Sequence, residues 1–407
     1  MDEQRFRELV EHYLLPMFSG ASLRPERYPS TPGHATVAWK DPCRIWVKPA
    51  RASDYRLLVE RSQPFDLSDR KVVESFITIL DRIAAALPES YAPDLLKSFE
   101  RSVVACSANA GGNEAVMVRT IDALSEWSTQ TYEGGRISAA IGFDVHGDRG
   151  IGRLDLSSLW DEDFLRVLSN GIDTILICNP YGKILRYESL PPPETPPSFA
   201  PLRLASIAAW AQNGRVAVAL NRNGEILVLR DNRLDFAKRR GVWHHFTHEP
   251  IFRQMGRPQS QKVRRAIYET CLDTSFARAG GCIAVATSNN ERRITDFVSA
   301  GDLIENSLSP KTKLMKSIIS QKFQEIDRLR RQELVAIDGA VVLDHTGSIR
   351  AVGAIVKLPG GSTGGGRLAA AKQLSRLGLA MKISADGGIR AFKGGPNKPT
   401  REVFTIC

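Results

Sequence analysis

The segment Ile337-Asp338-Gly339-Ala340-Val341-Val342-Leu343 places one carboxylate inside an apolar run near the C-terminus. After a turn and a second apolar run comes the tract Gly360-Gly361-Ser362-Thr363-Gly364-Gly365-Gly366-Arg367, which leads into a helical pattern. A carboxylate can bind a metal ion, and glycines before a helix can turn backbone N–H groups toward phosphates. The two segments together predict a nucleotide site.

The residues around these segments alternate between strand and helix patterns. Residues 282–286 form a short apolar run of the kind found in strands buried on both faces. A helical period over residues 311–332 precedes a predicted strand at 334–343, which would carry Asp338. We expect residues 261–407 to form an α/β domain in which helices flank a mixed β-sheet.

The chain before residue 261 predicts two further domains. Residues 1–170 show helix and strand periods without recognisable chemistry, and we expect an N-terminal α/β domain that senses a signal or regulates assembly. Residues 171–260 contain short apolar runs between turn residues, which predicts a small antiparallel β-rich domain. The proline-rich stretch 189–201 is the best linker candidate, because proline stiffens the chain and lacks an N–H donor. The predicted class is α/β (α+β).

Composition restricts the class of protein. The 407 residues are 43% hydrophobic and 25% charged, which indicates a folded chain of two or three domains. The net charge of +10 favours polyanionic partners, although the basic residues lie in scattered clusters, so nucleic acid is the less favoured partner.

The location of the protein is predicted from features that the sequence lacks. The six cysteines form no CxxC pair, which indicates neither a zinc site nor a disulfide framework. The N-terminal residues lack the apolar core of a signal peptide, and no segment approaches about 20 apolar residues. We therefore expect a cytoplasmic protein that does not enter a membrane.

The local environment of Asp338 leaves two interpretations open. An ionised aspartate within an apolar strand is costly to bury unless it faces a cleft or meets a cation. Gly339 and Ala340 add little bulk, so a ligand could approach the backbone there. The alternative is a strand-end aspartate that accepts a hydrogen bond from a loop amide.

The glycine tract also has two interpretations. Gly361 and Gly366 have the spacing of a P-loop, but Arg367 stands where that motif has lysine, and Leu368 replaces the Ser or Thr that binds magnesium. A P-loop ATPase is therefore excluded. The tract can still present N–H groups and the guanidinium of Arg367 to phosphates, and the alternative is a flexible loop without a ligand.

The order of motifs in the last third of the chain resembles the diadenylate cyclase domain, the catalytic module of bacterial DNA-integrity scanning proteins and related cyclic-di-AMP synthases. The matching elements are the apolar strand at 280–285, Asp338-Gly339-Ala340, the strand at 351–355, the loop ending in Arg367, and residues 383–388. The segment 238–243 is similar to the region that precedes the domain in divergent, sensor-linked members.

The resemblance implies a nucleotidyltransferase that condenses two ATP molecules into a cyclic dinucleotide. Two ATP-bound protomers of a homo-oligomer would meet face to face, and each ribose 3′-hydroxyl would attack the other α-phosphate. Asp338 would be catalytic and would hold Mg²⁺ or Mn²⁺, and Arg367 would be the second catalytic residue. The implied nucleotide-binding residues are Gly339, Ala340, Gly364, Gly365, Gly366, Arg367 and Ser384.

The sequence departs from that family at three places. The usual Arg-His-Arg motif is Arg367-Leu368-Ala369 here, Ile337 replaces a histidine before the aspartate, and Ala385-Asp386 replaces an acidic pair. These departures support a second hypothesis, a catalytically inactive regulator of the same fold that binds ATP or a cyclic dinucleotide.

Three neighbouring histidines, His244, His245 and His248, carry no recognised metal motif. The HExxH order is absent, and the residues before them have a strand pattern. We expect histidines at the surface or at an interface.

Overall fold

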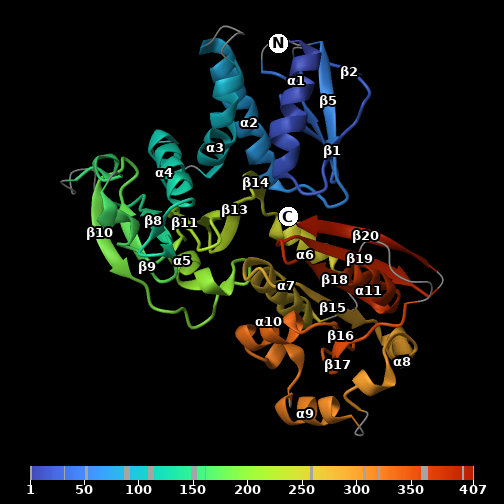
Figure 1. Cartoon of the computed structure of the whole chain (residues 1–407). Helices are drawn as coiled ribbons and strands as arrows, with labels where there is room; N and C mark the ends of the chain where they lie inside the picture. The colour runs from blue at the N-terminus through green and yellow to red at the C-terminus, as the bar shows by residue number, and fades with distance from the viewer. Residues whose placement is uncertain are drawn as a thin grey trace. The chain divides into compact units, whose positions relative to one another are not determined.

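The computed structural model describes residues 2–31, 33–50, 54–86, 92–108, 114–147, 154–160, 162–256, 260–305, 309–319, 321–358, 365–396 and 398–406. The chain divides into two compact units, Met1–Thr247 and His248–Cys407 (Figure 1). Both units combine helices with β-sheets, which confirms the predicted α+β class.

Unit 1, Met1–Thr247, begins with a small antiparallel sheet and a group of helices. The sheet has the order β1-β5-β4-β3, with β2 also paired to β5. Its strands are β1 (Ser22–Leu23), β2 (Tyr28–Pro29), β3 (Val37–Asp41), β4 (Arg44–Val47) and β5 (Tyr55–Glu60). The helices are α1 (Glu3–Leu9), α2 (Leu67–Ala86), α3 (Ala92–Ala108) and α4 (Glu114–Trp127).

The second sheet of unit 1 has seven strands in the order β10-β9-β8-β11-β12-β13-β14. They are β8 (Ala139–Phe143), β9 (Thr174–Cys178), β10 (Ile184–Ser189), β11 (Val216–Leu220), β12 (Ile226–Arg230), β13 (Arg233–Arg239) and β14 (Val242–His245). The predicted antiparallel meander from residue 216 onward is present. Two-residue turns join β12 to β13 and β13 to β14, with positive φ angles at Asp231, Asn232, Arg240 and Gly241, as type I′ hairpins require.

The expected division of unit 1 at residue 170 falls inside this sheet, because β8 and β9 lie on either side of it and pair in parallel. The stretch 189–201 does not link two units. The N–H of Leu190 donates to the carbonyl of Asp173 (2.6 Å), and the N–H of Leu234 donates to that of Phe199 (2.9 Å). The stretch therefore follows the sheet and leads into α5 (Ala205–Trp210).

Unit 2, His248–Cys407, is built on a six-stranded mixed sheet of order β17-β16-β15-β18-β19-β20. The strands are β15 (Gly281–Ala286), β16 (Ala340–Leu343), β17 (Ile349–Ala354), β18 (Gly378–Ile383), β19 (Ile389–Gly395) and β20 (Lys398–Ile406). Strands β15 and β16 are parallel, and the other neighbours are antiparallel. The strand β20 was not predicted from the sequence, because Lys398, Thr400 and Arg401 interrupt its apolar pattern.

Helices cover both faces of this sheet. Helices α6 (His248–Gln254), α7 (Gln261–Phe276) and α10 (Arg328–Ala336) precede α11 (Gly366–Leu374), while α8 (Ile294–Phe297) and α9 (Pro310–Ile318) are short. Cys282 and Ala284 pack with Ala371 and Leu374 of α11 in one core. Successive side chains of a strand point to opposite faces, and Val335 of α10 packs against Gly281. Burial on both faces explains the entirely apolar β15.

The predicted helix over residues 311–332 is wrong. The structure has α9, a 3₁₀ turn at Phe323–Glu325, and α10, which begins anew because the side chain of Asp327 caps it by accepting from the N–H of Arg330 (3.0 Å). Helix α10 extends to Ala336, and β16 begins only at Ala340. Asp338 therefore lies in the connection between helix and strand rather than inside a strand.

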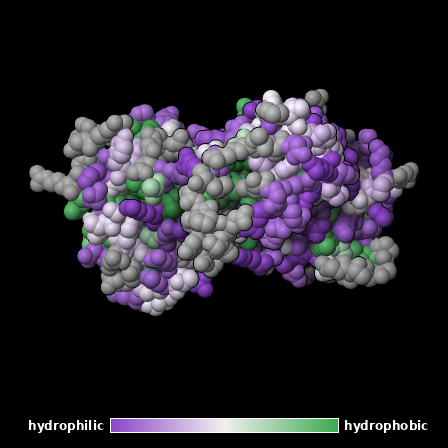
Figure 2. Space-filling view, turned by 90° about the horizontal axis from the view of Figure 1, so that it is seen from above, coloured by the Kyte–Doolittle hydropathy of each residue, from purple (hydrophilic) through white to green (hydrophobic). Residues whose placement is uncertain are grey.

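The surface is mostly hydrophilic. Figure 2 shows one face, on which hydrophilic residues predominate and hydrophobic residues form small separate patches. Within the described ranges, no helix combines the length and the apolar character that a membrane span requires.

Candidate functional site

The candidate site lies at one end of the six-stranded sheet. Because β15 and β16 are parallel and β17 and β18 run antiparallel to them, the first two strands begin where the latter two end. Asp338 precedes β16 and Ser384 follows β18, so the register brings both to this end. The sequence alone does not reveal this meeting, because it depends on the strand order.

The side chains of Asp338 and Arg367 meet there, although they are far apart in the sequence. Oδ1 of Asp338 lies 3.7 Å from Nη2 of Arg367. The Asp338 side chain is 99% exposed and that of Arg367 is 39% exposed. An exposed pair of this kind stabilises a fold little, so the carboxylate is free to exchange its partner for a ligand.

Gly280 is a site residue that the sequence reasoning did not assign. A Cβ atom at this position would overlap Nη1 of Arg367, and it would lie 3.5 Å from the backbone nitrogen of Ala385. Because Gly280 has no side chain, the guanidinium can lie directly against the backbone that precedes β15. Burial raises the pKa of the Cys282 thiol to about 12, and the nearby charge of Arg367 lowers it by a smaller amount.

Two buried ion pairs hold α10, and with it the start of the Asp338 connection. The guanidinium of Arg328 donates to both carboxylate oxygens of Asp273 on α7 (2.9 and 2.7 Å). Nη2 of Arg331 donates to Glu269 on the same helix (2.8 Å). All four side chains are at most 9% exposed, and each buried carboxylate has a guanidinium as its partner.

Gly339 and Ala340 have structural reasons for their small size. Gly339 has φ 102°, and a Cβ there would overlap the carbonyl carbon of Gly353 on β17. Ala340 is 1% exposed in the core. Packing alone therefore explains why both residues are small, without the room for a ligand that the sequence suggested. Only the backbone of Gly339 and Ala340 could contact a nucleotide.

The N-terminus of α11 supplies backbone donors at this end of the sheet. Gly365 is the N-cap residue with φ 90°, a conformation that favours glycine. The first N–H groups of a helix have no intrahelical partner and point along the positive end of the helix dipole. Gly366 and Arg367 occupy this first turn. Gly364 and the rest of the tract before it lie outside the described residues.

A second cation accompanies Ser384. Lys382 is paired directly with Cys282 across β18 and β15, so its side chain lies on the α11 face of the sheet. Its ammonium donates to the hydroxyl of Ser384. Arg367, Lys382 and the first turn of α11 therefore form a basic surface of the kind that binds phosphate groups.

Asp338 is an exposed carboxylate at this end of the sheet and is open to a cation. The nearby Asp302 accepts from Nζ of Lys311 (2.7 Å) and from the N–H of Ile355 (2.8 Å), and that ammonium also donates to the carbonyl of Gly353 (2.6 Å). One exposed carboxylate beside a phosphate-binding surface fits Mg²⁺ or Mn²⁺, since such ions are commonly held by one or two carboxylates, phosphate oxygens and water. The donor set therefore suits the predicted metal, with Asp338 as the protein ligand.

Two of the three histidines differ from the sequence prediction, because they are buried rather than at the surface. His245 is 5% and His248 is 0% exposed. The Nδ1 atom of His248 is hydrogen bonded to the hydroxyl of Tyr268 (2.7 Å) in unit 2. Burial lowers the pKa of His244 to about 4.

His245 belongs to a polar cluster that stabilises the start of α2. Its Nε2 lies 3.0 Å from Oγ of Ser68, and its Nδ1 lies 3.0 Å from the carbonyl of Asp235. Asp66 accepts from the N–H of Asp69 (3.1 Å) and Asp69 accepts from the N–H of Asp66 (2.8 Å), which is a reciprocal helix cap. The hydroxyl of Thr247 also donates to Asp69 (2.6 Å). The cluster is structural, because its members satisfy one another.

A further group, Glu291, Asp344 and His345, has ligand atoms within 4.8 Å of one another. Asp344 follows β16, whereas Asp338 precedes it, so this group lies at the other end of the strand. Oδ1 of Asp344 accepts from the N–H groups of Thr346 (2.9 Å) and Ser348 (3.0 Å), as in a tight turn. The group therefore does not extend the candidate site.

No family model and no curated protein matches this sequence. Among solved structures, the chain is similar to a double mutant of DacA from Staphylococcus aureus, a diadenylate cyclase, with 16% identity and a TM-score of 0.23. The match covers 35% of this chain and 87% of DacA. The chain thus has a weak structural neighbour among the diadenylate cyclases, and the functional inference rests on the residues of the site.

Proposed function

We propose that the protein is a nucleotidyltransferase that condenses two ATP molecules into a cyclic dinucleotide at the Asp338–Arg367 site of unit 2. The observation that carries this proposal is the meeting of an exposed carboxylate with a guanidinium (3.7 Å) beside the first turn of α11. Phosphoryl chemistry needs positioning and charge neutralisation more than it needs a protein nucleophile. The site offers both.

Each residue has a defined task in this reaction. Arg367, Lys382 and the N–H groups of Gly366 and Arg367 bind and orient the phosphates. Asp338 accepts a hydrogen bond from the ribose 3′-hydroxyl and orients it toward the α-phosphate of the other ATP. The 3′-oxygen then forms a bond to that phosphorus, pyrophosphate leaves, and the hydroxyl proton passes to solvent.

A divalent cation completes the proposal. A bound Mg²⁺ or Mn²⁺ would neutralise phosphate charge and lower the pKa of the attacking hydroxyl. Asp338 would hold this ion together with phosphate oxygens. Because each product contains two nucleotides, we propose that two copies of unit 2 face one another in a homo-oligomer.

The direct test is incubation of the full chain with ATP and Mg²⁺ or Mn²⁺, followed by mass spectrometry of the products. We expect a cyclic dinucleotide and pyrophosphate, no product after chelation with EDTA, and a specific activity that rises with protein concentration. Unreacted ATP with both metals across a wide range of protein concentrations would refute the transferase. A linear rather than cyclic product would refute the face-to-face arrangement.

The loss of a histidine and a second arginine after Arg367 favours a second candidate, a regulator that binds ATP or a cyclic dinucleotide without turnover. The side chains of Leu368 and Ala369 cannot donate hydrogen bonds in their place. Calorimetry separates the two functions. Tight nucleotide binding without product formation supports the regulator, whereas product formation excludes it.

A further inference from the structure

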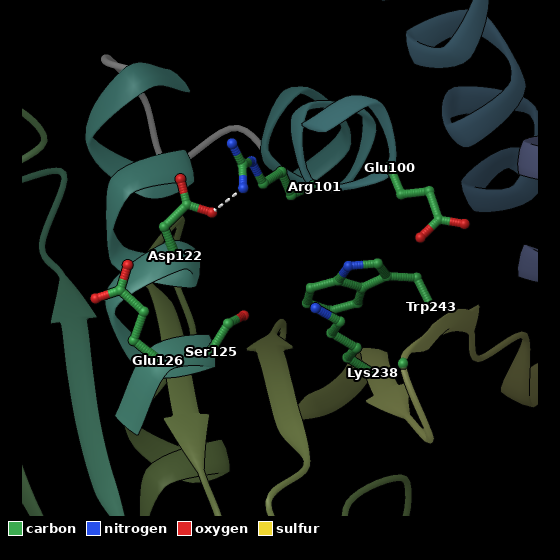
Figure 3. Close-up of a pocket in the computed structure, with 8 residues that line it drawn as sticks. Glu100, Arg101, Asp122, Ser125, Glu126, Lys238 and Trp243 are labelled. Carbon is green, nitrogen blue, oxygen red and sulfur yellow. Dashed lines mark ion pairs between the residues drawn. The ribbon is translucent and has the colours of Figure 1, made fainter. Parts of the chain in front are cut away.

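A separate pocket lies within unit 1, between helices α3 and α4 and the hairpin of β13 and β14. Its volume is about 410 Å³, and Glu100, Arg101, Asp122, Ser125, Glu126, Lys238, Gly241 and Trp243 line it. Small-molecule sites typically have volumes of about 300–1,000 Å³. In the view of Figure 3, Lys238 and Trp243 lie between Glu100 and the two acidic residues of α4.

Three of the five charged residues that line this pocket have no ion-pair partner among the described residues. Arg101 and Asp122 form an ion pair (2.5 Å), which Figure 3 marks with a dashed line. Within the described part of the chain, Glu100, Glu126 and Lys238 form no ion pair and no side-chain hydrogen bond. Two carboxylates and one ammonium therefore remain for a ligand.

The electrostatics of the pocket also favour a bound cation. Burial raises the pKa of the Glu100 carboxyl, and the charge of Lys238 offsets this rise only in part. Burial likewise raises the pKa of Asp122, with a further contribution from Glu126 one helical turn away. An added positive charge would stabilise all three carboxylates.

The positions of these carboxylates argue against a metal ion as the ligand. Glu100 is on α3, whereas Asp122 and Glu126 are on α4. Among the described residues, the groups whose ligand atoms converge on a common point do not include them. Because the carboxylates of the pocket are separated, the matching ligand should carry its charges on separate groups.

We propose that this pocket binds a basic α-amino acid, a molecule with two cationic groups and one carboxylate. Its two cations meet Glu100 and Glu126, and its carboxylate meets the ammonium of Lys238. The ligand thereby matches each unpaired charge of the pocket with one of opposite sign. The buried Nε of Arg101, which has no hydrogen-bond partner among the residues that the structure describes, supplies a further donor for the ligand carboxylate. This inference does not depend on the function of unit 2.

The test is calorimetric titration of the full chain with L-arginine and L-lysine, beside two analogues that each lack one charge. Argininamide lacks the carboxylate, and N-acetylarginine lacks the α-ammonium. We expect saturable binding of the amino acids, and affinities at least about tenfold lower for both analogues, since each loses a charge-assisted interaction. No binding of either amino acid, or equal binding of an analogue, would overturn the proposal.

Variants of the pocket provide the second part of the test. Glu100→Gln and Lys238→Met should each lower the affinity for L-arginine by at least about tenfold. Glu11→Gln, an exposed glutamate on the same unit, is the matched control and should bind as the wild type does. Circular dichroism of each variant checks the fold, and unchanged affinity in both folded pocket variants would contradict the proposal.

The pH dependence distinguishes a direct contact from a structural role. A cation binds the ionised form of Glu100, whose carboxyl lies near enough to Lys238 of β13 for that charge to lower its pKa, and which lines the same pocket as Asp122 and Glu126 of α4. Affinity should therefore fall as the pH is lowered through the raised pKa of Glu100, and the Glu100→Gln variant should show a smaller fall. Identical pH profiles in the two proteins would exclude Glu100 as a contact.

Discussion

Two aspartate–arginine pairs of unit 2 have the same chemistry and opposite surroundings. Asp273 and Arg328 are 0% and 7% exposed and share two hydrogen bonds, whereas Asp338 is 99% exposed and only 3.7 Å from one nitrogen of Arg367. A buried charge must keep its partner, and an exposed one need not. The first pair therefore fixes a helix, and the second is available to a ligand.

The largest effect is expected from Arg328→Met, which leaves the Asp273 carboxylate buried without its guanidinium. Removing one partner of a buried pair costs about 3–5 kcal/mol of unfolding free energy. Urea denaturation of unit 2 measures this loss. Arg330→Met on the same helix is the control, because Arg330 is 77% exposed. Equal losses of unfolding free energy in the two variants would show that the buried Arg328–Asp273 pair does not fix the helix.

The second effect concerns the exposed pair. Asp338→Asn should lower the rate of cyclic dinucleotide formation by about 10²-fold or more, as the removal of a charge that stabilises a transition state does. The urea midpoint should stay at the wild-type value, because the carboxylate is already in water. Asp296→Asn, an exposed aspartate on α8 (61% exposed), should retain the full rate. A shifted midpoint in Asp338→Asn would assign that residue to stability.

A smaller effect is expected from Gly280→Ala, which fills the space that the Arg367 guanidinium occupies. The guanidinium must move, and ATP affinity should fall by about tenfold through a lost charge-assisted hydrogen bond. Calorimetry with ATP measures the change. Gly301→Ala is the control, since a Cβ there meets nothing within 4 Å. Equal ATP affinities in the two variants would show that Arg367 does not bind the phosphates in this position.

The smallest effect is expected at Glu100. This carboxylate is partly buried, so its exposure lies between that of Asp273 and that of Asp338, and it has no ion-pair partner among the described residues. Its raised pKa means that the folded state binds the proton more tightly than the unfolded state, so ionisation destabilises the fold above that pKa. Glu100→Gln should therefore be slightly more stable than the wild type at pH 7. The difference should vanish below a pH of about 4, where an ordinary glutamate is protonated in both states. Thermal denaturation of both proteins between about pH 4 and pH 7 measures this difference in stability. A difference that does not change with pH would contradict the raised pKa of Glu100.

Local patterns predicted the elements that depend on neighbouring residues. The apolar run of β15, the period of α7 and the turns of the meander lie where the sequence indicates, because burial on two faces and positive φ angles leave local signatures. The prediction of one helix over 311–332 was wrong because the apolar period in the sequence continues across Asp327, where a new helix begins. The strand predicted around Asp338 failed since Leu334, Val335 and Ala336 are apolar in either conformation.

The candidate site could be predicted only in part. Asp338 and Arg367 carry recognisable chemistry, and the fold brings their side chains together. Gly280 and Lys382 could not be assigned, because their positions depend on which strands are neighbours. The pocket of unit 1 left no sequence signal at all, since its charges come from two helices and a hairpin. Charged residues at such positions look like an ordinary solvated surface until the fold is known.

Two hydrogen bonds hold neighbouring residues on either side of the boundary between the units. Thr247 is tied to Asp69 in unit 1, and the next residue, His248, is tied to Tyr268 in unit 2. The backbone on either side of the peptide bond between residues 247 and 248 is therefore anchored within its own unit by a side-chain hydrogen bond.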